Sequence, residues 1–139
     1  MNVMVDTNIL LDDLLDRVPY HENACQITRM ITDKKIFGYV TVNSLTDIYY
    51  VVGKNLNETI AREAIRKIIG IFQVLAVDEN DCNQALDLPI GDFEDALVVV
   101  CAEKAALNYI ITNDKAFLNQ RDLPVRPISP ADFLLEFEG

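Results

Sequence analysis

The sequence is poor in the residues that staple small proteins or bind zinc. It contains three cysteines, Cys25, Cys82 and Cys101, which stand far apart. Their number and spacing match neither a disulfide framework nor a zinc motif. Each is flanked by apolar positions of an expected helix, so we interpret all three as small buried hydrophobic side chains. The single histidine, His21, lies near an expected helix start and is interpreted as a surface residue rather than a catalytic one.

Long apolar runs are also missing. No stretch approaches the roughly 18 apolar residues that cross a bilayer. Segment 1–15 lacks a basic beginning and carries three aspartates, which is not the pattern of a signal peptide. There is no internal repeat and no low-complexity segment. We therefore expect a cytoplasmic protein without a membrane segment, and the length of 139 residues predicts a single domain over 1–139.

Basic residues are scarce. The chain has 12 Lys and Arg against 22 Asp and Glu, which gives a net charge of −10. This balance argues against a protein that holds nucleic acid mainly through a basic surface. It does not exclude a nuclease with an acidic site, because bound cations reverse the local charge. Arg62 and Arg66 share a helical face, but Glu58 and Glu63 lie one turn before Arg62 and Lys67, so this face is interpreted as solvated and self-paired.

Short apolar segments alternate with amphipathic ones along the whole chain. The pattern predicts strands at 3–5, 37–42, 72–77, 109–112 and 125–128, separated by helices at 9–15, 24–31, 44–53, 57–69, 78–88, 92–107, around 117 and from 129 onward. Strands joined through helices need crossover connections, which favour parallel pairing with both faces covered. We expect an α/β fold: a three-layer α/β/α domain with a mainly parallel central sheet of about five strands.

Four aspartates come from segments that meet at one edge of such a sheet. Asp6 follows the first strand, Asp114 follows the fourth, and Asp47 and Asp95 lie in the first turns of helices that start on the same side. Ligands of parallel sheets gather beyond the carboxyl ends of the strands. Carboxylates suit Mg²⁺ or Mn²⁺, and such a cation polarises a phosphoryl oxygen and activates water. The sequence therefore predicts an acidic metal site for hydrolysis.

Helix capping is an alternative explanation for part of this set. Ser44 and Asp47 have the spacing of a capping box, and Asp92 and Asp95 have the same spacing. Capping alone contributes about 0.5–2 kcal/mol of stability and no chemistry. For Asp47 and Asp95 both explanations stay open.

Capping explains the other acids unequally. Asp78 and Asp81 precede a predicted helix and are interpreted as caps only. Asp6 and Asp114 each follow a hydrophobic strand, where a carboxylate without a partner is partly desolvated at a cost in free energy. These two acids therefore favour the interpretation as a site.

Four short segments also have the order and spacing of a known family. They read Val-Asp-Thr-Asn at 5–8, Ser-Leu-Thr-Asp-Ile-Tyr at 44–49, Asp-Phe-Glu-Asp-Ala-Leu at 92–97 and Ile-Thr-Asn-Asp-Lys-Ala-Phe at 111–117. Together they resemble the PIN-domain family, which includes the VapC-like toxin ribonucleases. The resemblance implies a metal-dependent endoribonuclease that uses one or two Mg²⁺ or Mn²⁺ ions, with Asp6, Asp95 and Asp114 in the metal site.

The resemblance assigns further roles. It makes Asp92 an accessory ligand or only a cap. The second acid of the family is usually Glu, whereas this chain has Asp47, whose shorter side chain is expected to act through water. The polar neighbours that would orient carboxylates or water are Thr7, Asn8, Thr112 and Asn113. Lys115 directly follows Asp114 and is our candidate for a phosphate contact.

Partners and alternatives follow from the same patterns. The resemblance implies RNA as substrate and, for the toxin half of a toxin–antitoxin pair, an antitoxin protein. The expected helix at 57–69 and the residues after it carry isoleucines at 60, 65, 68, 69 and 71, more than one buried face of a helix requires. Because an additional exposed apolar patch usually marks an interface, we predict a homodimer. One alternative is a catalytically weak PIN module that binds RNA or assists assembly. Another is a phosphatase or phospho-acceptor domain, although haloacid-dehalogenase-like enzymes need an acid where this chain has Asn8.

Overall fold

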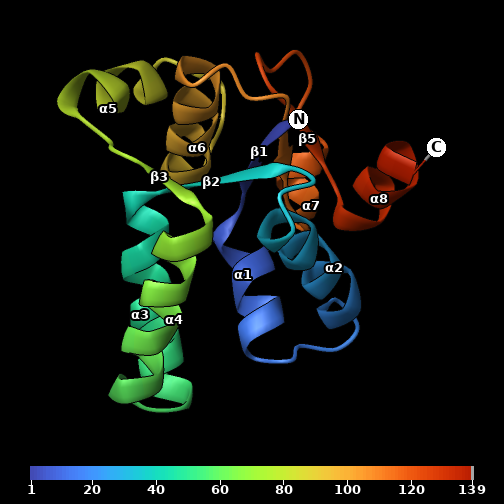
Figure 1. Ribbon diagram of the computed structural model, residues 1–139. Coiled ribbons are helices and arrows are strands. Elements are labelled where there is room, and N and C mark those ends of the chain that lie inside the picture. Colours follow the sequence, from blue (N-terminus) through green and yellow to red (C-terminus); the bar gives the residue numbers. More distant parts are fainter. Residues whose placement is uncertain (139) are drawn as a thin grey trace.

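The computed structural model describes residues 1–138 and has a five-stranded parallel sheet at its centre (Figure 1). The sheet order is β3-β2-β1-β4-β5, and every neighbouring pair is parallel. The strands are β1 (Asn2–Val5), β2 (Phe37–Thr41), β3 (Gln73–Leu75), β4 (Tyr109–Ile111) and β5 (Arg126–Ile128). The predicted α/β class with helices on both faces is confirmed, and β1 occupies the middle of the sheet.

The helices form two layers around the sheet (Figure 1). One face is covered by α1 (Thr7–Leu14), α2 (His21–Thr32), α3 (Val42–Asn55), α4 (Glu58–Ile71) and α8 (Pro130–Glu138). The other carries α6 (Phe93–Lys104) and the short α7 (Lys115–Leu118), with α5 (Glu79–Leu86) packed on α6. The α3–α4 pair extends beyond the sheet beside α1. The carboxyl ends of the strands therefore open toward a space bordered by α1 and α3.

The two layers are packed by alternate residues of β1. Val3 and Val5 belong to the core cluster beneath α1 to α4, whereas Met4 belongs to the cluster beneath α6 and α7. This is the period of two expected for a strand buried on both faces. Helix α6 is buried on every side from Ala96 to Ala102, because it lies between the sheet and α5.

Helix α3 begins earlier and ends later than the sequence pattern indicates. Val42, predicted as the last residue of a strand, opens the helix, and Thr41 is its N-cap with Oγ1 accepting from the amide of Ser44 at 3.3 Å. Ser44 is therefore not the cap, and the expected capping box with Asp47 is wrong. Gly53 does not stop the helix, which continues to Asn55. Asp47 lies beyond the first turn, where capping cannot explain it.

The caps of α5 are as predicted. Asp78 Oδ1 accepts from the amide of Asp81 at 2.9 Å, and Asp81 Oδ2 accepts from the amide of Asp78 at 3.0 Å. Lys104 Nζ donates to the same Asp81 oxygen at 2.7 Å, which lowers the pKa of this buried carboxyl. This pair serves the fold alone. Within residues 1–138 no helix combines the length and apolar character of a membrane-spanning segment.

Candidate metal-binding active site

An open pocket of about 560 Å³ lies at the carboxyl ends of β1 and β4. Six carboxylates line it, and they come from four separate segments of the chain: Asp6, Asp47, Asp92, Glu94, Asp95 and Asp114. The remaining lining residues are Thr7, Asn8, Leu11, Tyr50 and Val51. Among these described lining residues there is no lysine, arginine or histidine. The structure thus gathers the five acids named from the sequence into one pocket and adds Glu94.

Asp6 is held between its own strand and β4. Its amide donates to the carbonyl of Ile111 at 3.0 Å, which continues the pairing of β1 with β4. Oδ1 caps α1 by accepting from the amide of Thr7 at 2.9 Å, and Oδ2 accepts from Thr112 Oγ1 at 2.8 Å. Burial raises the pKa of Asp6, the two hydrogen bonds lower it, and the charge of Asp114 raises it again.

Asp114 begins the turn that follows β4. Oδ1 caps the short α7 by accepting from the amides of Ala116 at 2.9 Å and Phe117 at 3.3 Å, and the ring of Phe117 is buried beneath the sheet. The amide of Asp114 donates to Thr112 Oγ1 at 3.1 Å. One hydroxyl therefore contacts both acids that follow central strands.

The acids at the start of α6 have different roles: one caps the helix and another does not. Asp92 is the N-cap and accepts from the amide of Asp95 at 3.1 Å. In α5 the acid at the third helical position, Asp81, returns such a bond, but the described hydrogen bonds of α6 contain no return from Asp95. Burial, followed by the charges of Asp92 and Asp6, raises the pKa of Asp95 to about 7. The carboxylate of Asp95 is therefore not a capping group.

Sequence reasoning missed Glu94. Its carboxyl forms a hydrogen bond with Asp47 on α3, and this bond, partial burial and the charges of Asp47 and Asp6 raise the pKa of Glu94 to about 7. The carboxyl of Glu94 can therefore change its protonation state near neutral pH. The available signal was the run from Asp92 to Asp95, because three acids in one first turn cannot all serve as caps.

The polar neighbours take more varied positions than expected. Thr7 lines the pocket, and its Oγ1 lies 2.8 Å from Ser44 Oγ, which links α1 to α3. Asn8 lines the pocket and is exposed. Thr112 donates its hydroxyl hydrogen bond to Asp6, as described above. Lys115 is exposed at the start of α7 and is not among the residues that line the pocket.

Asn113 points away from the acidic cluster toward a second missed residue, Asp12. Asn113 Nδ2 donates to Asp12 Oδ2 at 3.3 Å, and Arg17 Nη1 lies 3.8 Å from Asp12 Oδ1. Asp12 is buried, and burial raises its pKa against the effect of these two partners. An acid within the apolar run of α1 was the signal in the sequence. Its contacts position the loop between Thr112 and Asp114 and are not part of the pocket.

The donor set of the pocket fits a hard divalent cation. Carboxylate oxygens are the ligands that Mg²⁺ and Mn²⁺ prefer. Burial, first of all, raises the pKa of Asp6 and Asp95, the hydrogen bond with Asp47 raises that of Glu94, and the neighbouring negative charges raise all three further. A bound dication would relieve that repulsion. The acids present are therefore suited to hold one.

Fold and pocket together define a parallel α/β protein with a carboxylate site at the carboxyl edge of its sheet. The sequence profile of the PIN domain matches residues 2–116, a span that includes all six pocket acids. The chain belongs to the PIN domain family, and the resemblance seen in the sequence is confirmed.

Named relatives agree with this assignment. The chain is 28% identical over 120 residues to Ribonuclease VapC1 of Aquifex aeolicus, with 83% of each protein covered. Among solved structures, VapC20 of Mycobacterium tuberculosis superposes with a TM-score of 0.69 at 18% identity, covering 90% of this chain and 99% of the other. A chain in the structure of VapBC2 from Rickettsia felis bound to a DNA fragment superposes with a TM-score of 0.66 at 16% identity, covering 93% of this chain and 98% of the other. At these identities the two structures show a shared fold.

Proposed function

We propose that this chain is a metal-dependent endoribonuclease that hydrolyses phosphodiester bonds of RNA with Mg²⁺ or Mn²⁺. The observation that carries the proposal is the pocket itself: six carboxylates from four segments face one space without a basic residue among those that line it. Such a concentration of charge opposes folding unless a cation balances it. The Aquifex relative, named as a ribonuclease, supports RNA as the substrate.

The acids take different roles in this proposal. Asp6, Asp95 and Asp114 hold the cation, and Asp92 adds negative charge from its capping position. A divalent cation bound there supplies positive charge beside the scissile phosphate and lowers the pKa of water. Thr112 keeps the carboxylate of Asp6 turned toward the pocket.

The Asp47–Glu94 pair supplies the group that handles protons. Because the pKa of Glu94 lies near 7, its carboxyl can accept a proton from water and return it to the leaving oxygen at neutral pH. The pair also compensates for the Asp at position 47, where the family usually has Glu. Glu94 brings a longer carboxylate to the place where Asp47 is one methylene short.

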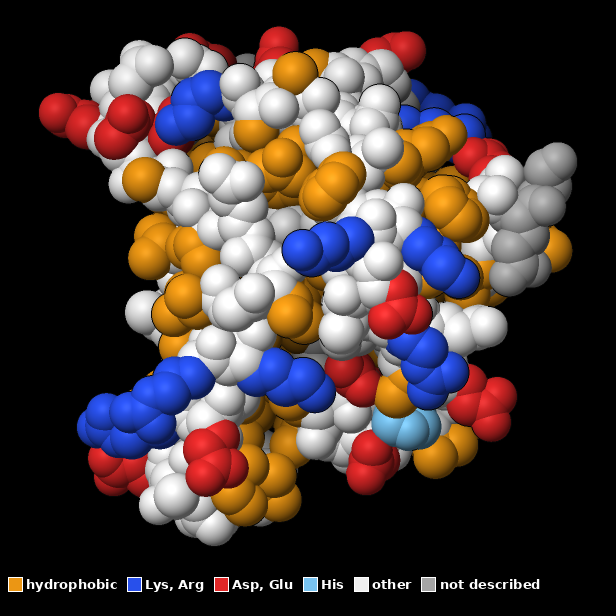
Figure 2. Space-filling model, viewed as in Figure 1, with side chains coloured by type: hydrophobic (Ala, Val, Ile, Leu, Met, Phe, Trp, Pro, Cys, Tyr) orange, Lys and Arg blue, Asp and Glu red, His pale blue; other side chains and the backbone are white. Residues whose placement is uncertain are grey.

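Features at the rim of the pocket suit an unpaired nucleotide. The ring of Tyr50 is largely exposed, lines the pocket and has Lys54 Nζ 5.9 Å from its centroid. An exposed ring stacks with a base of single-stranded RNA, and the adjacent ammonium attracts phosphate. Lys115 remains a proposed phosphate contact beside Asp114. On the face seen in Figure 2 the basic side chains are scattered among acidic and hydrophobic ones, so binding depends on local contacts.

The test is cleavage of labelled single-stranded RNA with and without divalent cations. Cleavage should require Mg²⁺ or Mn²⁺ and stop with EDTA, and Asp6→Asn, Asp95→Asn or Asp114→Asn should each lower the rate at least about a hundredfold. Asp33→Asn, at the exposed end of α2, is the matched control and should cleave normally. Cleavage that persists in chelator would reject the mechanism. RNA binding without cleavage in Mn²⁺ would favour the alternative of a catalytically weak module.

We also propose two protein partners, an antitoxin and a second copy of the chain. Solved structures of the same fold include DNA-bound VapBC2 of Rickettsia felis and a toxin–antitoxin complex of Klebsiella pneumoniae. On this chain, Ile60 and Ile69 of α4 are exposed, as is Leu56 just before that helix. Exposed apolar side chains are ones that an interface can cover. A monomeric mass by light scattering at micromolar concentration would contradict the homodimer.

A further inference from the structure

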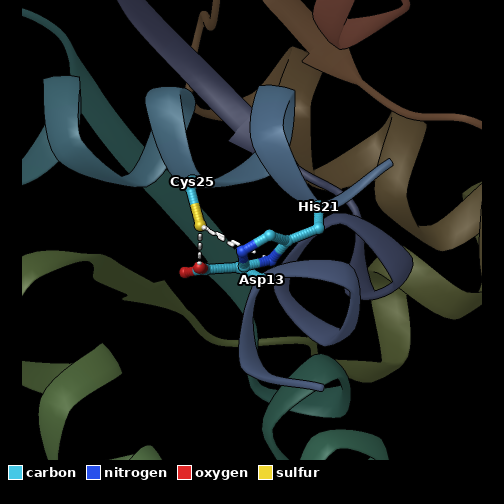
Figure 3. Close-up of side chains that lie close together, drawn as sticks. All are labelled: Asp13, His21 and Cys25. Atoms are coloured by element: carbon cyan, nitrogen blue, oxygen red, sulfur yellow. Dashed lines mark hydrogen bonds between the residues drawn. The ribbon is translucent and has the colours of Figure 1, made fainter. Parts of the chain in front are cut away.

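A second cluster of metal-binding side chains lies outside the acidic pocket. Asp13 comes from the last turn of α1, and His21 and Cys25 come from the first turns of α2 (Figure 3). Their candidate ligand atoms all lie within 4.8 Å of one another. We propose that these three side chains form a binding site for a transition-metal cation of the Zn²⁺ type. This inference does not depend on the ribonuclease activity.

Helix geometry explains how the three residues meet. His21 and Cys25 are four positions apart, so they lie one above the other on the same face of α2. That face packs against α1, which presents Asp13 from across the connecting loop. A search for spacing within one segment cannot find this set, because the acid belongs to another helix. Cys25 is only half-buried and its thiol donates to Asp13, so its interpretation as a small buried hydrophobic side chain is wrong.

The sulfur–nitrogen distances are those of a metal site, and because Sγ is nearly equidistant from both ring nitrogens, the imidazole turns to direct one nitrogen at an ion. Cys25 Sγ lies 3.5 Å from His21 Nε2 and 3.6 Å from Nδ1. A tetrahedral ion with bonds of about 2.3 Å to sulfur and about 2.0–2.1 Å to nitrogen holds these atoms roughly 3.6 Å apart. Cys25 Sγ donates to Asp13 Oδ1 at 2.8 Å. An ion that replaces this thiol proton, released to solvent, moves the sulfur and oxygen apart to roughly 3.6 Å.

The surroundings of the histidine complete the arrangement. His21 Nδ1 lies 3.4 Å from the carbonyl oxygen of Asp12 and 3.4 Å from Asp16 Oδ1. Metal-binding histidines usually donate their second ring nitrogen to a carbonyl or carboxylate, which fixes the tautomer and the ring orientation. Nε2 is then the nitrogen that faces the cation. Asp13, His21 and Cys25 are half-buried, so the site is accessible to solvent ions.

The ligand chemistry separates this cluster from the acidic pocket. Thiolate and imidazole select Zn²⁺, Co²⁺ or Ni²⁺, whereas a site of carboxylates alone suits Mg²⁺ or Mn²⁺. An ion here would join α1 to α2. None of the three residues of the cluster is among those that line the acidic pocket, so the two sites share no ligand.

Titration of the full chain with Co²⁺ under metal-free reducing conditions tests the proposal. A thiolate-to-cobalt charge-transfer band should grow and saturate at one ion per chain. The band should vanish in Cys25→Ala and persist in Cys82→Ala, a matched change at another half-buried cysteine. His21→Ala and Asp13→Ala should each weaken Co²⁺ binding at least about tenfold, because losing a ligand costs no less than losing its supporting partner.

Two results would overturn the proposal. One is the absence of a thiolate band in the unmodified chain at excess Co²⁺, a result that requires no variant to fold. The other is a band that survives in Cys25→Ala. Thermal unfolding with Zn²⁺ gives a second measurement, since Zn²⁺ should raise the melting temperature of Asp95→Asn but not of Cys25→Ala. The reverse pattern would place Zn²⁺ in the acidic pocket and contradict the cluster.

Discussion

The hydroxyl of Thr112 donates a hydrogen bond of 2.8 Å to Asp6 Oδ2 across 106 positions of sequence. The hydroxyl oxygen of Thr112 also accepts a hydrogen bond of 3.1 Å from the amide of Asp114. This hydroxyl therefore fixes the orientation of the Asp6 carboxylate relative to the turn that carries Asp114. The bond also lowers the pKa of Asp6 against the effect of burial, so it keeps a desolvated acid available as an anion.

Replacing Thr112 by valine removes the hydroxyl at nearly constant volume. We expect Mn²⁺ affinity or the cleavage rate to fall about 10–100-fold, as for other residues that orient a ligand, and less than in Asp6→Asn. The pKa of Asp6 should rise, which NMR of labelled carboxyl groups can measure. Thr28→Val is the matched control, because Thr28 Oγ1 donates to the carbonyl of Ala24 within α2. Unchanged Mn²⁺ affinity and rate would show that Thr112 has no orienting role.

Asp95→Asn should make the cation-free protein more stable at neutral pH. The folded pKa of Asp95 is about 7, above its ordinary 3.8, so its protonated form stabilises the fold below about pH 4. That contribution is lost as the pH rises through 7. In EDTA at pH 8 we expect the variant to gain about 1 kcal/mol after allowance for solvent screening, with a flatter dependence on pH.

The same variant should respond less to Mn²⁺. An intact site gains about 2.7 kcal/mol at a hundred times its dissociation constant. Thermal unfolding of both proteins with and without Mn²⁺ measures the difference, and Asp78→Asn, a substitution at another cap, is the control. Equal shifts in all three proteins would mean that Asp95 does not hold the cation.

Asp47→Asn should lower the pKa of Glu94. In EDTA the pKa of Glu94 is about 7, raised first by its hydrogen bond with Asp47 and also by the charge of Asp47. The substitution should move it toward the ordinary value of 4.5. NMR titration of Glu94 measures this directly, with Asp33→Asn as the distant control. A pKa of Glu94 that stays near 7 would show that Asp47 is not its partner.

Glycine substitutions on β2 and α4 should have opposite effects on stability. A Cβ at Gly38 would lie 2.6 Å from Ile31 Cδ1 and 2.8 Å from the ring of Phe72, so Gly38→Ala should destabilise the protein by about 1–3 kcal/mol. A Cβ at Gly70 meets nothing within 4 Å, and in this helix Gly70→Ala should stabilise by about 0.5–1 kcal/mol. Urea unfolding checks both. An unchanged free energy of unfolding in Gly38→Ala would mean that the side chains packed against β2 can shift to make room for a Cβ.

The sequence was sufficient for features that depend on strand order. Short apolar strands separated by helices allow few topologies, so the edge at which Asp6 and Asp114 meet could be predicted before their neighbours were known. Asp95 could be placed at the same edge from the sequence. That its carboxylate does not cap the helix could not be predicted. The acid at the third helical position caps a helix only when its carboxylate accepts a hydrogen bond from the backbone of the N-cap residue. Asp81 of α5 does so and Asp95 of α6 does not, although the two helices have the same spacing of acids.

Features that depend on contacts between elements escaped the sequence. Glu94 matters because α3 brings Asp47 beside it, and Asp12 matters because the loop after β4 turns Asn113 toward α1. The start of α3 was misplaced for a local reason. Val42 is as suitable for a strand as for a helix, and the hydroxyl of Thr41, one residue earlier, decides the boundary.

The burial of α6 links the pocket to the most protected backbone of the molecule. Amide hydrogens of a helix enclosed between a sheet and another helix exchange with solvent only when the core opens. Asp95 lies in the first turn of that helix, whereas Cys101 lies in its last turns. If Asp95 holds a cation as proposed, binding should slow deuterium uptake along the whole helix by the factor that it adds to global stability. The far end of α6 reports on the occupancy of a site that it does not touch.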